Sequence, residues 1–150
     1  MSVIDDVKVI IGEKEPYQKT KASGAFQKIL IVEDDPILSE MYKDKFLKEK
    51  FQVDTAENGK IGLEKAQENK PGIILLDLMM PVMDGKTMLR HLREIPGYKK
   101  LPVIVLTNAG EVDNIRETQR YDNAVEFLVK SNVTVEEIAQ KVKFWLPAIL

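Results

Sequence analysis

The stretch GIILLDLMMPVMDG, residues 72–85, decides how this chain folds. Four apolar residues, from Ile73 to Leu76, run directly into the carboxylate of Asp77. A carboxylate at the end of so apolar a run is costly to remove from water. Asp77 therefore either emerges into solvent at the end of a buried strand or serves a group that needs a negatively charged oxygen.

Similar apolar runs recur along the chain and alternate with amphipathic stretches. The runs predicted as strands cover residues 28–35, 51–56, 72–77, 101–107 and 124–130. The stretches predicted as helices cover residues 36–50, 58–69, 84–95, 111–122 and 133–146. Strands that alternate with helices predict an α/β fold with a parallel sheet covered on both faces. The near-continuous apolar character of the strands agrees, because a sheet buried on both sides shows no polar alternation.

Two of the predicted helices carry further signals. The apolar residues of the first helix are expected on one helical face, and they are Ile37, Leu38, Met41, Tyr42, Phe46 and Leu47. Asp35 and Pro36 suit the start of that helix. Thr134 and Glu137 form a capping pattern at the start of the last helix, and the run Phe144–Leu146 near its end is expected in the core.

Composition narrows the class of protein. The 150 residues are enough for one domain, with 44% apolar and 31% charged residues. A net charge of −2 gives no basic excess of the kind seen on nucleic-acid-binding surfaces. Cysteine is absent, which excludes disulfides and zinc thiolates. No apolar run reaches the roughly 18 residues of a membrane span, and the acidic N-terminus is unlike a signal peptide, so a cytoplasmic protein is expected.

The chain is expected to divide into three parts. Residues 1–27 are an N-terminal extension with a polar linker, residues 28–147 are the folded domain, and residues 148–150 are a C-terminal tail. Within the extension, the stretch SVIDDVKVIIG fits a short helix, with Ile4, Val7 and Ile11 at roughly helical spacing, but its β-branched residues fit a strand equally well.

The ends of the predicted strands share a chemical character. The first strand ends in Glu33, Asp34 and Asp35, the third in Asp77, the fourth in Thr107 and the fifth in Lys130. In open α/β sheets, ligands bind outside the carboxyl ends of the strands. If all strands are parallel, these polar groups gather at one edge of the sheet.

Such a cluster indicates a metal-assisted phosphoryl site. Close carboxylates repel one another unless a cation neutralises them, and oxygen ligands without His or Cys suit Mg²⁺ or Mn²⁺. We expect Asp34 and Asp77 to hold the metal, with Glu33 assisting through water. A phosphoryl group passes to Asp77, and Thr107 and Lys130 bind its remaining oxygens.

Four segments resemble the receiver domain of the response regulators of two-component signal transduction. They are ILIVEDD (29–35), IILLDLMMPVMDG (73–85), PVIVLTNAG (102–110) and FLVKS (127–131). The resemblance covers residues 28–147. It implies a flavodoxin-like, doubly wound (βα)5 sheet with strand order 2-1-3-4-5, and a phosphohistidine of a sensor histidine kinase or phosphotransfer protein as the phosphoryl donor.

The resemblance also implies a role for individual residues. Asp77 matches the phosphoacceptor, Glu33 and Asp34 match the acid pair, and the backbone carbonyl of Met79 matches a metal ligand. Thr107 and Lys130 match the switch hydroxyl and the phosphate-binding lysine. Phe127 matches the aromatic switch residue. The chain departs from the family at two positions: Ser131 stands where a proline usually follows the lysine, and Asn108 stands where a small residue usually follows the threonine.

The function expected is that of a stand-alone, phosphorylation-activated response regulator. Such a domain is no conventional enzyme, but it catalyses its own Mg²⁺-dependent aspartyl phosphorylation and dephosphorylation. Output is expected through residues about 111–146, to a downstream protein or a second copy, with no direct nucleic-acid or membrane contact. The alternative is a pseudo-receiver, a protein-binding module without phosphoryl transfer. A haloacid-dehalogenase-like phosphatase is disfavoured because Met79 stands where that class needs a second acid.

Overall fold

The computed structural model of the protein describes residues 27–108, 122 and 125–146. The predicted helix over residues 111–122, apart from Asp122, lies outside these described residues. So do residues 1–26 of the extension and the C-terminal tail. The division of the chain at residues 27 and 147 therefore stays a prediction.

The described elements alternate between strands and helices, as predicted. The strands are β2 (Lys28–Val32), β3 (Gln52–Ala56), β4 (Ile73–Asp77), β5 (Val103–Thr107) and β6 (Val125–Val129). The helices are α1 (Pro36–Lys48), α2 (Gly59–Asn69), α3 (Gly85–Glu94), the short 3₁₀ turn η3 (Lys130–Asn132) and α5 (Val135–Trp145). Strand β2 ends three residues earlier than predicted, so Glu33, Asp34 and Asp35 lie beyond it, and β6 ends one residue earlier, before Lys130.

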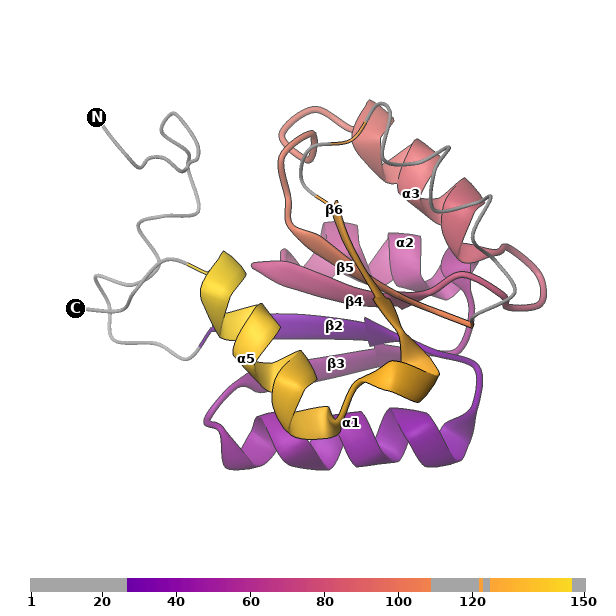
Figure 1. Ribbon diagram of the computed structural model, residues 1–150. Helices are drawn as coiled ribbons and strands as arrows, with labels where there is room; N and C mark the ends of the chain where they lie inside the picture. The colour runs from indigo at the N-terminus through magenta and orange to yellow at the C-terminus, as the bar shows by residue number, and fades with distance from the viewer. Residues whose placement is uncertain (1–26, 109–121, 123–124, 147–150) are drawn as a thin grey trace.

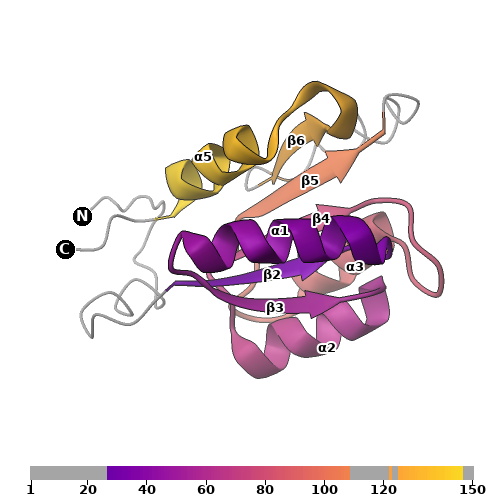
Figure 2. The ribbon, with the colours of Figure 1, turned by 90° about the horizontal axis from the view of Figure 1, so that it is seen from below.

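The five strands form one parallel sheet in the order β3-β2-β4-β5-β6. Counted along the chain this order is 2-1-3-4-5, which confirms the predicted doubly wound topology. Helices α1 and α5 lie on one face of the sheet, and α2 and α3 lie on the other (Figures 1 and 2). Val32 pairs with Leu76, and Asp77 pairs with Leu106, so the strands finish at a common edge.

The core is divided by the sheet into two apolar layers. Successive residues of a strand point to opposite faces, so each central strand feeds both layers. Ile29, Ile31, Ile73 and Leu75 pack with α1 and α5, whereas their neighbours Leu30, Val32, Ile74 and Leu76 pack with α2 and α3. Strand β4 is buried at all five positions, which explains why its sequence shows no polar alternation.

The apolar face of α1 is narrower than its sequence predicts. Tyr42 and Phe46 are buried and Leu38 packs against them, which confirms half of the predicted set. The prediction is wrong for the other half, because Ile37 is 78% exposed and Met41 and Leu47 are also exposed. Residues 38, 42 and 46 form a single i, i+4 stripe, and the side chains beside this stripe extend past the edge of the contact with the sheet.

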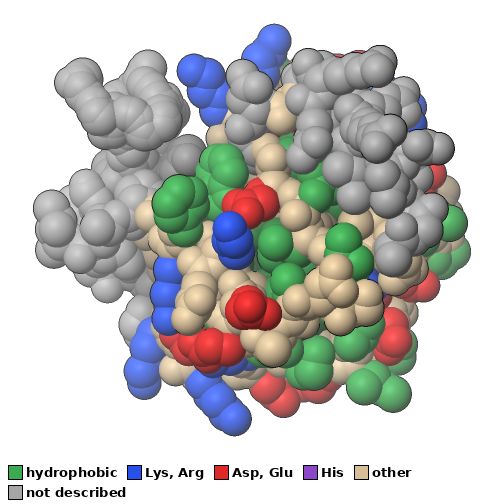
Figure 3. Space-filling model, viewed as in Figure 1, with side chains coloured by type: hydrophobic (Ala, Val, Ile, Leu, Met, Phe, Trp, Pro, Cys, Tyr) green, Lys and Arg blue, Asp and Glu red, His purple; other side chains and the backbone are tan. Residues whose placement is uncertain are grey.

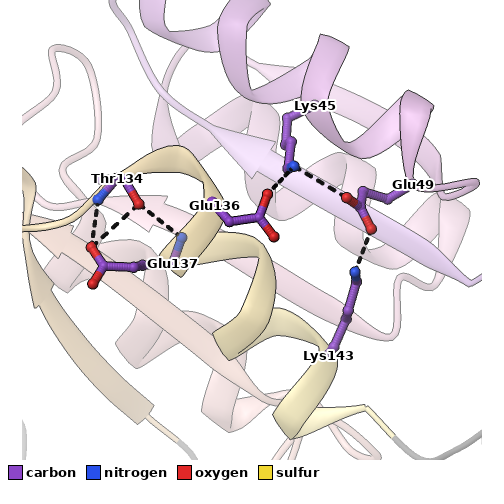
Figure 4. Close-up of polar contacts among 6 residues, drawn as sticks. All are labelled: Lys45, Glu49, Thr134, Glu136, Glu137 and Lys143. Atoms are coloured by element: carbon purple, nitrogen blue, oxygen red, sulfur yellow. Dashed lines mark hydrogen bonds and ion pairs between the residues drawn. The ribbon is translucent and has the colours of Figure 1, made fainter.

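The start of α5 is capped as its sequence predicts (Figure 4). The hydroxyl of Thr134 accepts a hydrogen bond from the backbone N–H of Glu137, and the Glu137 carboxylate accepts one from the backbone N–H of Thr134. These two bonds satisfy amide groups that the first helical turn leaves without partners. The start of α1 is also as predicted, because the Asp35 carboxylate accepts from the N–H groups of Ile37 and Leu38.

A chain of ion pairs joins α1 to α5 (Figure 4). The ammonium of Lys45 pairs with Glu136 of α5 and lies 3.1 Å from a carboxylate oxygen of Glu49. Glu49 in turn pairs with Lys143 near the end of α5. These four side chains of alternating charge form a ladder on the surface that links α1 to α5.

This ladder should make part of the stability acid-sensitive. Lys143, and then Lys45, lower the pKa of Glu49 below its ordinary value of 4.5. A carboxylate with a lowered pKa in the folded state adds stability above its unfolded pKa and loses it as the pH falls through the folded value. We therefore expect Glu49→Gln to lose less stability than the unsubstituted protein between neutral pH and pH about 3, as measured by urea unfolding. The exposed Glu68→Gln serves as the control. An equal loss in both variants would contradict the role of the ladder.

A half-buried guanidinium ties together the segments of chain on either side of β5. Arg93, near the end of α3, holds Asp122 with two hydrogen bonds of 2.7 and 3.1 Å. Its remaining nitrogen donates to the carbonyl oxygens of Tyr98 and Leu101, both at 2.8 Å. One side chain thus fixes the connection from α3 to β5 and the residue just ahead of β6. No sequence pattern pointed to this contact.

The end of α5 departs from expectation at one residue. Leu146 is buried and Trp145 packs against the core, as predicted, but Phe144 is 79% exposed. The prediction that Phe144 lies in the core is therefore wrong. Phe144 follows Lys143 on the outer side of α5, where its ring meets Trp145 edge to face. Among the described residues, no helix has the length and apolar character that a membrane crossing requires.

Candidate functional site

The polar residues predicted at the strand ends gather at one edge of the sheet. Asp77 and Thr107 are the last residues of β4 and β5, and Lys130 directly follows β6. Glu33 and Asp34 lie just beyond β2, the strand next to β4. The parallel register brings these side chains together from segments that are far apart in the sequence.

Three carboxylates form the centre of this edge. Glu33, Asp34 and Asp77 each offer an oxygen, and these oxygens all lie within 4.8 Å of one another. Glu33 and Asp77 are only 3% and 4% exposed, whereas Asp34 is exposed. An all-oxygen set with one open side fits Mg²⁺, which keeps several waters when it binds to proteins. These residues therefore fit the metal that the sequence predicts.

Glu33 is fixed by the turn that follows β2. Its backbone N–H donates to the carbonyl oxygen of Ala56 in β3 at 3.0 Å. Its carboxylate accepts a hydrogen bond from the backbone N–H of Asp35 at 3.1 Å. The carboxylate of Asp35 itself caps α1, which agrees with its expected role at the helix start.

Lys130 lies between the two buried carboxylates. Its ammonium is 3.1 Å from a Glu33 oxygen and 3.3 Å from an Asp77 oxygen. Burial alone would lower the pKa of Lys130, but the charges of Asp77 and Glu33 outweigh it and raise that pKa above its ordinary value. The turn η3, which carries Ser131 in place of the family's usual proline, thus delivers the lysine to the acid cluster.

Asp77 is poised to exchange a proton near neutral pH. Burial, and then the charge of Glu33, raise the pKa of its carboxyl group to about 7. Lys130 and a hydrogen bond from the backbone N–H of Met79 act in the opposite direction without reversing the shift. A bound cation would favour the ionised form, so metal and proton compete for this carboxylate.

This competition predicts that metal affinity depends on pH. Mg²⁺ needs the ionised form of Asp77, so its apparent affinity should fall about tenfold for each pH unit below about 7 and level off above it. A titration with Mg²⁺ followed by NMR measures this dependence. His91→Gln, which removes the only histidine of the chain and leaves the acid cluster untouched, is the control. An affinity that does not change between pH about 6 and about 8 would contradict the raised pKa.

The loop after β4 is built around close backbone contacts. The N–H of Gly85 donates to the Leu78 carbonyl oxygen at 2.8 Å, and Asp84 caps α3 through the N–H of Thr87. Val82 has a φ of 69°, a left-handed conformation that is rare for a β-branched residue. Met79 is 57% exposed beside this turn, and the role of its carbonyl as a metal ligand stays a prediction.

The two predicted switch residues occupy different settings. Thr107 is fully buried at the end of β5, and its hydroxyl donates to the Asn108 carbonyl oxygen at 3.3 Å. Phe127 lies in β6, half-buried against the layer that includes α2 and α3. Both lie on strands adjoining the acid cluster, but their movement on activation stays a prediction. Asn108 is exposed.

One residue near the site was missed by the sequence argument. Tyr42 is buried on the inner stripe of α1 and is 4% exposed. Burial raises the pKa of its hydroxyl, Lys130 lowers it, and Glu33 and Asp77 raise it again. The charged groups of the site thus contribute to the pKa of this hydroxyl. The available signal was a polar aromatic residue on the buried stripe of the helix that follows the acid pair.

Comparison with known proteins agrees with this geometry. The family model of the response regulator receiver domain matches residues 29–143. Transcriptional regulatory protein SrrA of Staphylococcus aureus strain NCTC 8325 is 34% identical over 115 residues. The match covers 77% of this chain and 46% of SrrA, so the chain spans about half the length of the curated relatives it matches.

Solved structures with the same fold include two that contain magnesium. The receiver domain of sensor histidine kinase PA1611 from Pseudomonas aeruginosa has a magnesium ion in its active-site cleft. It is 26% identical, with a TM-score of 0.70, over 81% of this chain and 98% of its own. Response regulator TrrA from Thermotoga maritima was solved in complex with Mg²⁺-BeF. It is 28% identical, with a TM-score of 0.69, over 81% of this chain and all of its own.

Proposed function

We propose that this chain, which belongs to the family of response regulator receiver domains, works as a phosphorylation-activated response regulator. It accepts a phosphoryl group on Asp77 from a phosphohistidine of a sensor histidine kinase or phosphotransfer protein. The observation that carries this proposal is the buried Asp77 carboxylate, flanked by Glu33, Asp34 and Lys130. The same carboxylate lies 3.3 Å from the ammonium of Lys130, the lysine that is proposed to bind the phosphoryl group.

The proposed transfer requires an ionised nucleophile. A carboxylate oxygen of Asp77 attacks the phosphorus, a P–O bond forms, the P–N bond of the donor breaks, and the imidazole nitrogen keeps the electron pair. Asp34, Asp77 and Glu33, with the Met79 carbonyl, would hold Mg²⁺ or Mn²⁺, and the metal would supply positive charge that neutralises the phosphoryl oxygens. Dephosphorylation follows when water attacks the phosphorus and releases inorganic phosphate.

Residues on the neighbouring strands are proposed to respond to the charge of the phosphoryl group on Asp77. Lys130 leaves its carboxylate partners and binds a phosphoryl oxygen, and the Thr107 hydroxyl donates to another. Phe127, on the neighbouring strand β6, changes its packing as Thr107 moves. Output then runs through residues about 111–146 to a downstream protein or a second copy, and the protein works in the cytoplasm.

A phosphoryl mimic tests this proposal directly. With Mg²⁺ and beryllofluoride, the full chain should show a bound fluoride signal by fluorine-19 NMR and amide shifts at Thr107 and Lys130. Lys130→Met should weaken the fluoride signal, whereas Lys141→Met on α5 should leave it unchanged. A chain that binds neither Mg²⁺ nor beryllofluoride would instead support the pseudo-receiver, a binding module without phosphoryl transfer.

A further inference from the structure

A groove lies between α5 and strand β6, next to the segment that connects them. Its volume is about 330 Å³, and it is lined by Leu128, Val133, Glu137, Gln140, Lys141 and Phe144. Figure 3 shows hydrophobic side chains gathered between α5 and β6 on this face, with acidic and basic side chains among them. The volume is at the small end of the range of ligand pockets, about 300–1,000 Å³. It suits a few apolar side chains of a peptide better than a whole cofactor.

The walls of the groove are held in place by polar contacts. Glu126 of β6 accepts a hydrogen bond of 2.7 Å from the indole of Trp145 and forms an ion pair of 2.7 Å with Lys141. These contacts fasten α5 to the edge strand of the sheet. Phe144 nevertheless exposes 79% of its surface at the end of the groove. A fixed groove with so large an exposed aromatic side chain is typical of a docking site.

The N-terminal extension leaves the folded domain beside this groove. A side-chain carbon added at Gly72 would lie 3.3 Å from Leu146 and 3.5 Å from Gln27, so these two residues meet around Gly72. Leu146 directly follows α5, and Figures 1 and 2 show the start of β2 near the end of this helix. Helix α5 is about 16 Å long at 1.5 Å per residue. Residues 12–26 can span up to about 50 Å, so they reach the whole groove.

The composition of residues 2–11 matches the groove. Ile4, Val7 and Ile11 offer apolar side chains at spacings of three and four residues. Asp5, Asp6 and Lys8 add charges of both signs, and the groove wall likewise carries both signs in Lys141 and Glu137. We propose that residues 2–11 dock in the groove between α5 and β6 of the same chain, with their apolar side chains against Phe144, Val133 and Leu128.

This proposal makes the groove a binding site for the chain's own N-terminus. A downstream protein that uses the same face has to displace the segment or bind beside it. The docking does not depend on phosphoryl transfer, so its failure would leave the proposed function of Asp77 unaffected, and the reverse also holds.

The absence of cysteine allows a direct test in the full chain. A nitroxide label on Ser2→Cys broadens the NMR signals of nearby amides in the ¹⁵N-labelled protein. We expect the amides of Val133, Gln140 and Phe144 to lose most of their intensity, while those of α2 and α3 keep theirs. Phe144→Ser should restore the lost intensity. Leu47→Ser, which removes an exposed apolar side chain from α1, should not.

A mixed sample identifies the occupant. It combines the ¹⁵N-labelled chain without nitroxide and the unlabelled chain with nitroxide, and we expect no broadening in it. If the groove amides broaden in the mixed sample as strongly as in the single chain, a second copy fills the groove and the proposal is wrong. Broadening that is absent from the groove, or spread evenly over both faces, would also overturn it.

Discussion

Asp77→Asn is expected to abolish phosphoryl incorporation from acetyl phosphate or from a phosphorylated histidine kinase. An amide oxygen is too poor a nucleophile to form an acyl phosphate, and the substitution also removes one charge from the metal site. Incorporation of labelled phosphate, or intact-mass measurement in the presence of Mg²⁺, should therefore fall to the background of a denatured sample. This loss of phosphorylation is the largest functional effect that we expect from a substitution of a single residue at the site.

The matched control for this variant is Asp35→Asn. Asp35 belongs to the same acidic run, but its carboxylate caps α1, and an asparagine caps a helix equally well. Phosphorylation of this variant should be unchanged. A loss of folding stability is not expected to explain the difference between the two variants. A carboxyl group with a raised pKa adds folding stability below its unfolded pKa, and this contribution is lost as the pH rises through about 7. Asp77→Asn should thus be at least as stable as the original protein at pH about 8 without metal. A stable acyl phosphate on Asp77→Asn would refute the assignment.

Gly85→Ala is expected to cost about 3 kcal/mol of unfolding free energy, a large effect for one methyl group. The added carbon would lie 2.3 Å from the carbonyl oxygen of Asp77 and 2.9 Å from the Cα of Leu78. Both neighbours are backbone atoms, so neither can rotate away as a flexible side chain would. The turn has to move, and it would carry the backbone of Asp77 with it. Mg²⁺ affinity should therefore fall together with stability.

Gly72→Ala provides the comparison for this substitution. Its added carbon would meet a Leu146 methyl group at 3.3 Å, a contact that a side chain can relieve by a small shift. Its cost should stay within about 1 kcal/mol in urea unfolding. If Gly85→Ala were as stable as Gly72→Ala and bound Mg²⁺ normally, the close packing of the turn against β4 would not matter for the site.

The sequence predicts most of this fold because the decisive signals are local or follow from simple topology. The unbroken apolar run of β4 indicates a strand buried on both faces, and parallel pairing then brings the strand ends to one edge. The positions of Asp34, Asp77 and Lys130 at that edge follow without any knowledge of packing. The strand order came from the family resemblance, since periodicity alone does not rank the neighbours of a strand.

The features that escaped prediction depend on distances across the fold. A helical period places Ile37 and Met41 on the apolar side of α1, but it does not tell how wide the contact with the sheet is. Phe144 is one residue away from Trp145, which packs against the core, and this step along the helix is enough to turn Phe144 to solvent. The sequence places Glu33 and Lys130, 97 positions apart, at the same edge of the sheet, but it does not predict the 3.1 Å hydrogen bond between them. The roles of Met79, Phe127 and residues 111–122 stay predictions, as does the expected lack of nucleic-acid contact.

The ion pair of Arg93 and Asp122 constrains how this sequence can change over evolutionary time. Losing either partner alone would leave a charge buried without its counterpart, at a cost of about 3–5 kcal/mol. Lysine cannot replace the arginine, because one ammonium cannot reach two carboxylate oxygens and two separate carbonyl oxygens in a fixed plane. A pair of well-packed apolar residues could replace both at little cost. Descendants of this chain should therefore keep the two positions together or exchange them together, and a lineage that has changed only one should carry a compensating substitution nearby.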